Sequence, residues 1–168
     1  KRDASGRLLC YEGTVEDITS RRKVEQDLRN SEALYHSLVE TLPQNIFRKD
    51  LQGRFTFANQ QFCATVGHPL HEIVGKSDYD FFFFLHADEA FRDEQEILRT
   101  GRPVIGKVEK NTLLDGIFSW VSTTKLPWHD EAGRLIGTFG LTRDITATKL
   151  AEDKFNEERT LLRTIIDH

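Results

Sequence analysis

The 168-residue sequence has no methionine, only two cysteines and four prolines, and no long apolar run. Without any Met, we expect it to be a piece of a longer protein. Cys10 and Cys63 are too few for a disulfide framework and fit a reducing, cytoplasmic environment. No segment approaches the roughly 20 apolar residues that span a bilayer, and no signal-peptide pattern occurs. Direct membrane contact is therefore not expected, although a membrane anchor elsewhere in the parent protein stays open.

Basic residues are also not in excess, since 23 Lys and Arg stand against 27 Asp and Glu, for a net charge of −4. This mixed charge argues against a nucleic-acid surface. The 38% hydrophobic and 30% charged residues are typical of a soluble globular chain. No Gly-x-Ser-x-Gly, Walker, kinase or nucleotide-cyclising signature is present. We therefore predict that the chain is not an enzyme.

One sequence motif occurs twice in the chain. "DASGRLLCYEGTVEDIT" (3–19) and "DEAGRLIGTFGLTRDIT" (130–146) align without a gap from turn through strand into helix. A repeat at this domain-sized distance predicts an array of similar domains. The chain then divides into the tail of a preceding domain (1–19), a linker helix (20–42), a complete domain (43–146) and an exit helix leading toward a further domain (147–168).

The linker segment "TSRRKVEQDLRNSEALYHSLVETL" is charged, lacks Gly and Pro, and carries apolar residues that step by four and three. This spacing is a heptad seam and predicts a coiled coil, which Pro43 ends. We therefore expect a homodimer through helices, with a helix lying on its own domain as the alternative. The seam consists of Val24, Leu28, Tyr35, Leu38 and Leu42.

The segment after Pro43 predicts the order strand, strand, helices, strand, strand, strand. Two short strands surround a Gln-Gly turn within Asn45–Asn59, Asn59 can cap a short helix that Gly67 ends, and the longest helix covers about Ala87–Arg99. Three further strands follow, separated by Asp-Gly and Ala-Gly turns. This order predicts an α+β fold with helices on one face of an antiparallel sheet.

Four stretches from about Leu42 to Thr146 together resemble the PAS domain family: "FTFANQQF", "IVGKSDYDFF", "ILRTGRPV" and "FSWVSTTKLPWHDEAGRLIGTFGLTRDIT". The resemblance implies a five-stranded antiparallel sheet of order 2-1-5-4-3, with short helices that form one wall of a pocket. It also implies a sensory and dimerisation module of a bacterial signalling protein, often joined in series with others by helices.

We therefore expect a non-enzymatic signal-relay module whose partners are neighbouring PAS domains and an effector, either a histidine kinase or a cyclic-dinucleotide enzyme. Two alternatives stay open: a cofactor- or metabolite-binding sensor, and an interaction scaffold with a filled core. The Asp-Ile-Thr triplet marks the relay junction at Asp144 and Thr146, and recurs at Asp17 and Thr19. We expect the Thr146 hydroxyl to cap the exit helix. We expect Asp144 to accept hydrogen bonds or to pair with a basic residue at the junction.

No cofactor is favoured. The stretch "SDYDFFFFL" lacks the cysteine of flavin-binding members of the family, and His86 stands only at the start of the long helix, where haem-binding members often carry a ligand within it. Cys63, His68 and His71 suit zinc, but no fourth ligand is evident unless Glu72 helps. We therefore predict no metal.

The candidate pocket lies between the sheet and the long helix. Its predicted residues are Phe47, Phe57, Phe82, Ile97, Ile105, Phe118, Trp120 and Ile136, with Lys107, Thr123 and Thr138 as polar groups within reach. No Arg or His at a strand centre is evident as an anchor, so a filled apolar core is favoured and an unknown small-molecule ligand stays open. In the run from Phe81 to Phe84, four consecutive residues cannot all face one core, so at least one should be exposed or covered by a partner.

Overall fold

The computed structural model describes residues 4–7 and 17–166, which fall into two units divided after Leu38. Helix α1, Thr19–Thr41, makes up most of the first unit and agrees with the predicted linker helix. Its start follows an Asx turn, because the Thr19 N–H donates to the Asp17 carboxylate at 2.9 Å. The predicted strand before it, from Arg7 to Ile18, lies almost entirely outside the described residues.

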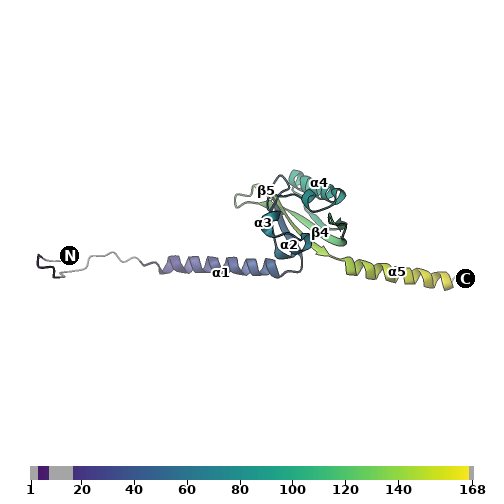
Figure 1. Cartoon of the computed structure of the whole chain (residues 1–168), viewed down its shortest axis with the longest axis horizontal. Coiled ribbons are helices and arrows are strands. Elements are labelled where there is room, and N and C mark those ends of the chain that lie inside the picture. Colours follow the sequence, from purple (N-terminus) through teal and green to yellow (C-terminus); the bar gives the residue numbers. More distant parts are fainter. Residues whose placement is uncertain (1–3, 8–16, 167–168) are drawn as a thin grey trace. The chain divides into compact units, whose positions relative to one another are not determined.

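The second unit contains a five-stranded antiparallel sheet of order β2-β1-β5-β4-β3 (Figure 1). Its strands are β1 Asn45–Lys49, β2 Phe55–Ala58, β3 Val104–Thr112, β4 Phe118–His129 and β5 Leu135–Asp144. This confirms both the α+β class and the strand order expected from the resemblance.

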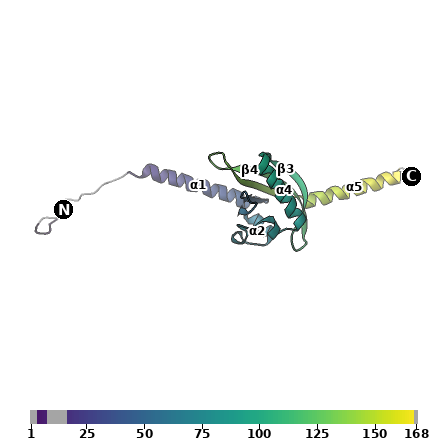
Figure 2. The ribbon, with the colours of Figure 1, turned by 90° about the horizontal axis from the view of Figure 1, so that it is seen from above.

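Three helices and a 3₁₀ turn follow β2 and pack on one face of the sheet. They are α2 Gln60–Val66, α3 Leu70–Ile73, η1 Asp78–Asp80 and α4 Phe84–Thr100. Helix α4 crosses the sheet over β3, β4 and β5 (Figure 2). As predicted, Asn59 caps α2 through its side chain and Gly67 ends it in the left-handed conformation that glycine adopts without strain. We call the sheet face beneath these helices the inner face.

An aromatic cluster fills the inner face around β1, β2 and α2. The rings of Phe47, Phe55 and Phe62 pack at centroid distances of 5.0–5.8 Å, and Phe81 and Phe82 complete the buried group. Each edge-to-face pair adds about 0.5–1.5 kcal/mol beyond area burial.

The run of four phenylalanines divides between core and surface. Phe81 and Phe82 are buried, whereas Phe83 is 48% and Phe84 66% exposed. Phe83 has an extended backbone at the N-cap position of α4, and the helix therefore begins at Phe84 rather than near Ala87. The structure confirms that the run cannot face one core.

A bulge in β2 decides which of its aromatic residues faces the helices. Arg48 lies opposite Phe57 and Lys49 lies opposite Phe55, so Thr56 has no partner on β1. The extra residue shifts the alternation of side chains by one. Phe55 therefore points inward, while Phe57 lies with Arg48 on the outer face of the sheet.

Helix α5, Thr146–Ile166, follows β5 directly and agrees with the predicted exit helix. In the described part of the chain, no helix combines the length and apolar character that crossing a membrane requires.

Candidate functional site

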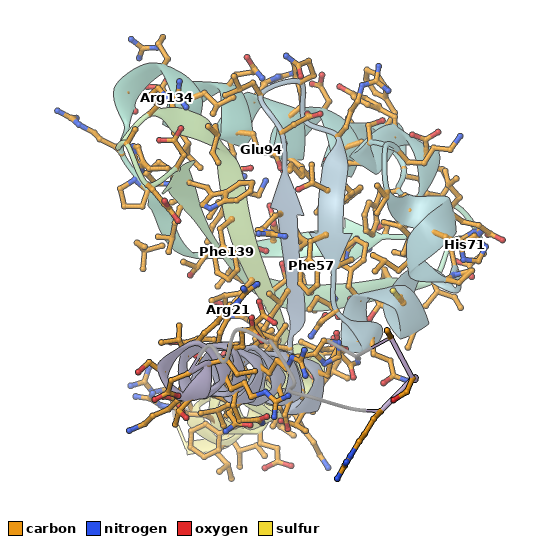
Figure 3. The ribbon with its side chains drawn as sticks, turned by 90° about the vertical axis from the view of Figure 1, so that its left-hand side faces the viewer. Arg21, Phe57, His71, Glu94, Arg134 and Phe139 are labelled. Carbon is orange, nitrogen blue, oxygen red and sulfur yellow. The ribbon has the colours of Figure 1, made fainter. Side chains whose placement is uncertain are left out.

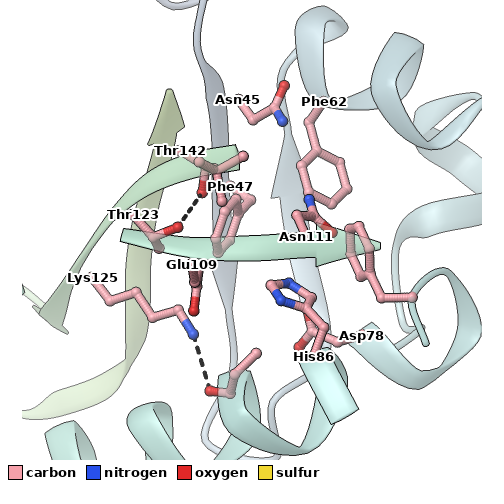
Figure 4. Close-up of a pocket in the computed structure, with 13 residues that line it drawn as sticks. Asn45, Phe47, Phe62, Asp78, His86, Glu109, Asn111, Thr123, Lys125 and Thr142 are labelled. Atoms are coloured by element: carbon pink, nitrogen blue, oxygen red, sulfur yellow. Dashed lines mark hydrogen bonds between the residues drawn. The ribbon is translucent and has the colours of Figure 1, made fainter. Parts of the chain in front are cut away.

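The inner face encloses a cavity between β3, β4, β5 and helix α4 (Figure 4). Side chains alternate along each strand, so Glu109 and Asn111 on β3 and Thr123 and Lys125 on β4 all project to this face. The lining residues are Asn45, Phe47, Phe62, Asp78, Phe82, His86, Ala90, Glu109, Asn111, Val121, Thr123, Lys125 and Thr142. The aromatic rings form one side of the cavity, and most of the remaining lining is polar.

Two buried polar atoms at the cavity, His86 Nδ1 and Asn111 Oδ1, have no hydrogen-bond partner. Glu109 Oε2 makes no hydrogen bond either, but it forms an ion pair with the Lys107 ammonium at 3.3 Å. Buried polar atoms are almost always paired, because an unpaired one costs about 1–3 kcal/mol. A water molecule or another polar group in the hollow would give His86 Nδ1 and Asn111 Oδ1 a partner.

The cavity is narrow in this conformation. It contains about 360 Å³ of space not filled by atoms, a figure that includes its opening to solvent. Between the side chains themselves, the hollow is about the size of a water molecule. An organic molecule would therefore enter only if side chains such as Phe82 and His86 moved aside.

A chain of ion pairs borders the cavity and joins five elements of the fold, η1, β1, α4, β4 and β3. In order, it joins Asp78, Lys49, Glu94, Lys125, Asp93, Lys107 and Glu109. Lys49 is fully buried and contacts both Asp78 and Glu94, the latter at 2.6 Å. Buried charges require such partners because desolvation of an isolated ion is costly.

The pKa values of this chain follow from burial and charge together. Burial alone would lower the pKa of Lys49, but the carboxylates of Asp78 and Glu94 outweigh it and raise the pKa above 10.5. Burial raises the pKa of Glu94, against the opposing effect of Lys49. Burial lowers the pKa of His86, although Glu109 and Asp78 act in the other direction. His86 therefore faces the cavity as a neutral imidazole at neutral pH.

Of the predicted pocket residues, Phe47, Phe82 and Thr123 line the cavity. Ile97 and Thr138 are buried and Lys107 is half-buried, but none of the three lines it. Ile136 is half-buried and also lies outside the lining.

Four predicted pocket residues lie elsewhere, and this part of the prediction is wrong. The β2 bulge places Phe57 on the outer face with Phe139, on either side of Arg48 (Figure 3). Phe118 and Trp120 alternate with the inward-facing Val121 on β4, so they also point outward. Ile105, at an irregularity in β3, is 67% exposed.

The expectation of an apolar core on this face is also wrong, because most of the lining residues that the prediction missed are polar. The missed polar residues are Asn45, Asp78, His86, Glu109, Asn111, Lys125 and Thr142. A signal was present in "KVEKNT", where Lys107, Glu109 and Asn111 take every second position. Such alternation normally places the polar residues on the solvent side of a strand. Here the helix-covered side is the polar one.

The junction between β5 and α5 is held by Asp144, Thr146 and the strand β4. The Asp144 carboxylate accepts the Thr146 N–H at 2.7 Å. The Thr146 hydroxyl accepts the Trp120 N–H at 2.9 Å, and the Ile145 N–H donates to the Trp120 carbonyl at 2.8 Å. The expectation that the Thr146 hydroxyl caps the helix is therefore corrected: Asp144 accepts the orphan N–H, and the hydroxyl attaches the helix start to β4.

The same local arrangement occurs at the start of α1. The Thr19 N–H donates to Asp17 at 2.9 Å, and the Arg22 N–H donates to the Ile18 carbonyl. The strand that the sequence repeat places before Asp17 lies outside the described residues, so the tandem repeat stays a prediction.

The metal candidates do not form a cluster. His68 contacts Glu72 at 2.8 Å, His71 is exposed, and Cys63 packs against the aromatic core, where burial raises its pKa. Across residues 4–7 and 17–166, no three His, Cys, Asp or Glu side chains are arranged to hold a metal ion.

The sheet order, the helical cover on one face and the helix that continues from the last strand define the class of α+β domains with the PAS fold. The family model described as "PAS fold" matches residues 39–150, and the chain belongs to this family.

Two curated relatives are signalling proteins. The methanogenesis regulatory histidine kinase FilI of Methanothrix harundinacea is 28% identical over 126 residues, which cover 75% of this chain and 14% of FilI. The C4-dicarboxylate transport sensor protein DctS of Rhodobacter capsulatus is 31% identical over 132 residues, which cover 78% of this chain and 20% of DctS. The chain thus corresponds to a small part of each relative and carries a PAS sensory domain.

Among solved structures, VqmA of Vibrio cholerae, described as a dimer in the absence of target DNA, is similar with a TM-score of 0.60 and 27% identity. The similarity covers 69% of this chain and 53% of VqmA. A further structure, of VqmA bound to DPO, has a TM-score of 0.58 and 26% identity over 64% of this chain and 55% of that one.

Proposed function

We propose that this domain senses a small polar molecule in the inner-face cavity and relays its binding to α5, without catalysing a reaction. The observation that carries the proposal is the convergence of two unpaired buried atoms, on His86 and Asn111, with the Glu109 carboxylate at one hollow. Ligand sites combine apolar walls with a few converging polar groups, as this cavity does.

A route from the cavity to the junction supports the relay. Thr142 on β5 and Val121 on β4 line the cavity. Each lies close along its strand to the point where Thr146 is attached to Trp120. A ligand that moves these strands would change how α5 leaves the sheet, and such a shift transmits a signal if two states differ in helix direction.

The relatives suggest where the signal goes. FilI is named a histidine kinase and DctS a transport sensor protein, and a VqmA structure is described with bound DPO. We propose that the parent of this chain is likewise a sensory protein whose effector is a histidine kinase or a cyclic-dinucleotide enzyme. We place it in the cytoplasm, with no nucleic acid or membrane as a direct partner of this segment.

Dimerisation through α1 is part of the proposal. Its predicted seam residues Val24, Leu28, Tyr35 and Leu38 are all more than half exposed, as is expected of a helix that awaits a partner. A second copy of α1 would cover these apolar side chains with its own residues at the same heptad positions.

A second candidate is a relay and scaffold module that binds nothing. The narrowness of the hollow favours it, because the described conformation leaves space for little more than a water molecule.

The two candidates are separated by removing one unpaired group. In Asn111→Leu, a side chain of similar size replaces the amide, so we expect an unfolding free energy raised by about 1 kcal/mol. If the domain is a sensor, native mass spectrometry should show a small molecule on the wild type and none on Asn111→Leu. A wild type that carries no small molecule, and that no compound stabilises against heat, would support the scaffold instead.

A further inference from the structure

The ion-pair chain begins and ends at the cavity. Its two terminal residues, Asp78 and Glu109, line the hollow, whereas Lys49 and Glu94 are buried outside the lining. His86 stands between the two ends, close enough that both carboxylates act on its imidazole. The charges of the ion-pair chain therefore act on any molecule that occupies the cavity.

In that chain, carboxyl groups outnumber ammonium groups. It contains four carboxyl groups (Asp78, Glu94, Asp93, Glu109) and three ammonium groups (Lys49, Lys125, Lys107), so it carries no excess positive charge. Burial raises the pKa of Glu94, while the ammonium groups of Lys49 and Lys125, 2.6 and 3.5 Å from its carboxylate, act in the other direction. Burial also lowers the pKa of His86, so its imidazole adds no positive charge at neutral pH.

The cation of the cavity lining is already engaged. Lys125 donates to the Ala90 carbonyl at 3.0 Å and lies 3.5 Å from Glu94. No arginine occurs in the lining of the described cavity. An anionic ligand would therefore meet no free positive charge, and its own charge would lie in a poorly solvated site beside Glu109 and Asp78.

The hydrogen-bonding atoms of the lining favour a ligand that donates. Asn111 Oδ1 is an acceptor without a partner, Glu109 Oε2 is an acceptor 3.3 Å from the Lys107 ammonium, and a neutral His86 accepts at one ring nitrogen. Hydrogen bonds from charged N–H donors to a carboxylate are roughly twice as strong as neutral ones. The rings of Phe47, Phe62 and Phe82 offer faces that attract a cation and cover apolar carbon.

We propose, as a refinement that rests on the proposed sensory function, that the cavity selects a small organic cation with N–H donors, such as an amidinium or a primary ammonium. The charged group would contact Glu109 and Asn111, and the carbon skeleton would pack on the three phenylalanine rings. Carboxylates, including dicarboxylates, are excluded by the charge of the site.

The test compares probes of one shape and different charge. Acetamidine, acetamide and acetate form a small set, and benzamidine, benzamide and benzoate a larger one, with succinate as a dicarboxylate. Binding to the full chain is measured by ligand-observed NMR and thermal shift. We expect the amidines to bind at least about ten-fold more tightly than the amides, and the carboxylates not to bind.

Two glutamate variants test whether Glu109 produces the preference for a cation. Glu109→Gln removes one of the two carboxylates that line the cavity with almost no change in shape, and Glu89→Gln removes an exposed carboxylate from α4. We expect Glu109→Gln to reduce the preference for amidine over amide by about ten-fold, and Glu89→Gln to preserve it. Circular dichroism verifies that both variants are folded.

The other possible results of these binding experiments also decide whether the cavity selects a cation. Equal or tighter binding of the amides or carboxylates, or an amidine preference that Glu109→Gln leaves intact, overturns the cation assignment while the sensory function stands. If no probe binds, the charge of the molecule carried by the wild type in native mass spectrometry decides, and an anionic or neutral molecule overturns it. If neither a probe nor a carried molecule is found, the sensory function itself fails.

Discussion

The hydroxyl of Thr146, the first residue of α5, accepts a hydrogen bond from the backbone N–H of Trp120 on β4 at 2.9 Å. The two residues are joined a second time through the Ile145 N–H, which donates to the Trp120 carbonyl. The exit helix is thus attached to a strand that also forms part of the cavity wall through Val121 and Thr123. A change in β4 therefore has a direct mechanical connection to α5.

Replacing Thr146 by Val tests this connection, because it keeps the shape and removes the hydroxyl. We expect the unfolding free energy to fall by about 1–2 kcal/mol, since the Trp120 N–H loses its partner. In the full-length parent, effector output should no longer respond to the stimulus that acts through this domain. Output is assayed with and without that stimulus.

The matched control is Thr19→Val, at the equivalent position of the preceding Asp-Ile-Thr triplet. This variant should leave signalling through residues 43–146 intact. A full-length Thr146→Val protein that responds normally would show that the triplet only ends a strand and starts a helix.

The buried ammonium of Lys49 should be essential to stability. Lys49→Met leaves the carboxylates of Asp78 and Glu94 without their shared partner, and we expect a loss of about 3–5 kcal/mol. The exposed Lys76→Met is the control and should change stability by no more than about 0.5 kcal/mol. Urea denaturation of the three proteins gives the comparison, and similar midpoints for all three would contradict the prediction.

Stability should also depend on alkaline pH through the same residue. The pKa of Lys49 is raised in the folded state, so its contribution is complete below the unfolded value of 10.5 and is lost as the pH rises through the folded value. The difference in unfolding free energy between wild type and Lys49→Met should therefore shrink above about pH 10.5. A difference that stays constant from neutral to strongly alkaline pH would rule out this ion pair as its source.

Gly140 on β5 is expected to tolerate no side chain. An added Cβ would lie 2.4 Å from two ring atoms of Phe47, so the ring would have to move within the aromatic core. We expect Gly140→Ala to cost about 1–3 kcal/mol. In the double variant Gly140→Ala/Phe47→Leu, the clash is absent, and the two costs should therefore be less than additive. Additive costs in chemical denaturation would show that the ring does not create the constraint.

The seam of α1 can be tested by charge. Leu28→Asp/Leu38→Asp places carboxylates in the proposed dimer interface, where unpaired charges are costly, so a folded monomer is expected. Gln26→Asp/His36→Asp, away from the seam on the same helix, should leave the dimer intact. Light scattering gives the mass of each protein. The seam is excluded if the wild type and both variants have the same mass.

Local chemistry determined much of this protein from the sequence alone. Asn59 sets the start of α2 and Gly67 sets its end, because a side-chain cap and a left-handed residue depend only on their immediate neighbours. The order of the elements, the start of α5 after Asp144 and the exposure of part of the phenylalanine run follow from similarly local rules.

Only the tertiary structure decided which face of each strand encloses the cavity. Alternation divides the residues of β4 into two sets, one with Trp120 and the other with Thr123 and Lys125, but does not determine which set lies under α4. The unpaired Thr56 reverses the alternation in β2 and moves Phe57 to the outer face. In β4, the sequence favoured an apolar set in the interior, and the packing of the helices placed a polar set there. In β2, the bulge placed Phe55 rather than Phe57 in the interior.

The ion-pair chain is likewise decided only by the tertiary structure. Lys49 and Glu94 lie on β1 and α4, far apart along the chain, and each on its own reads as a solvated charge. Burial of one ammonium is tolerable only because folding brings carboxylates within hydrogen-bonding distance of it. Sequence spacing contains no record of that proximity, since it arises when α4 crosses the sheet.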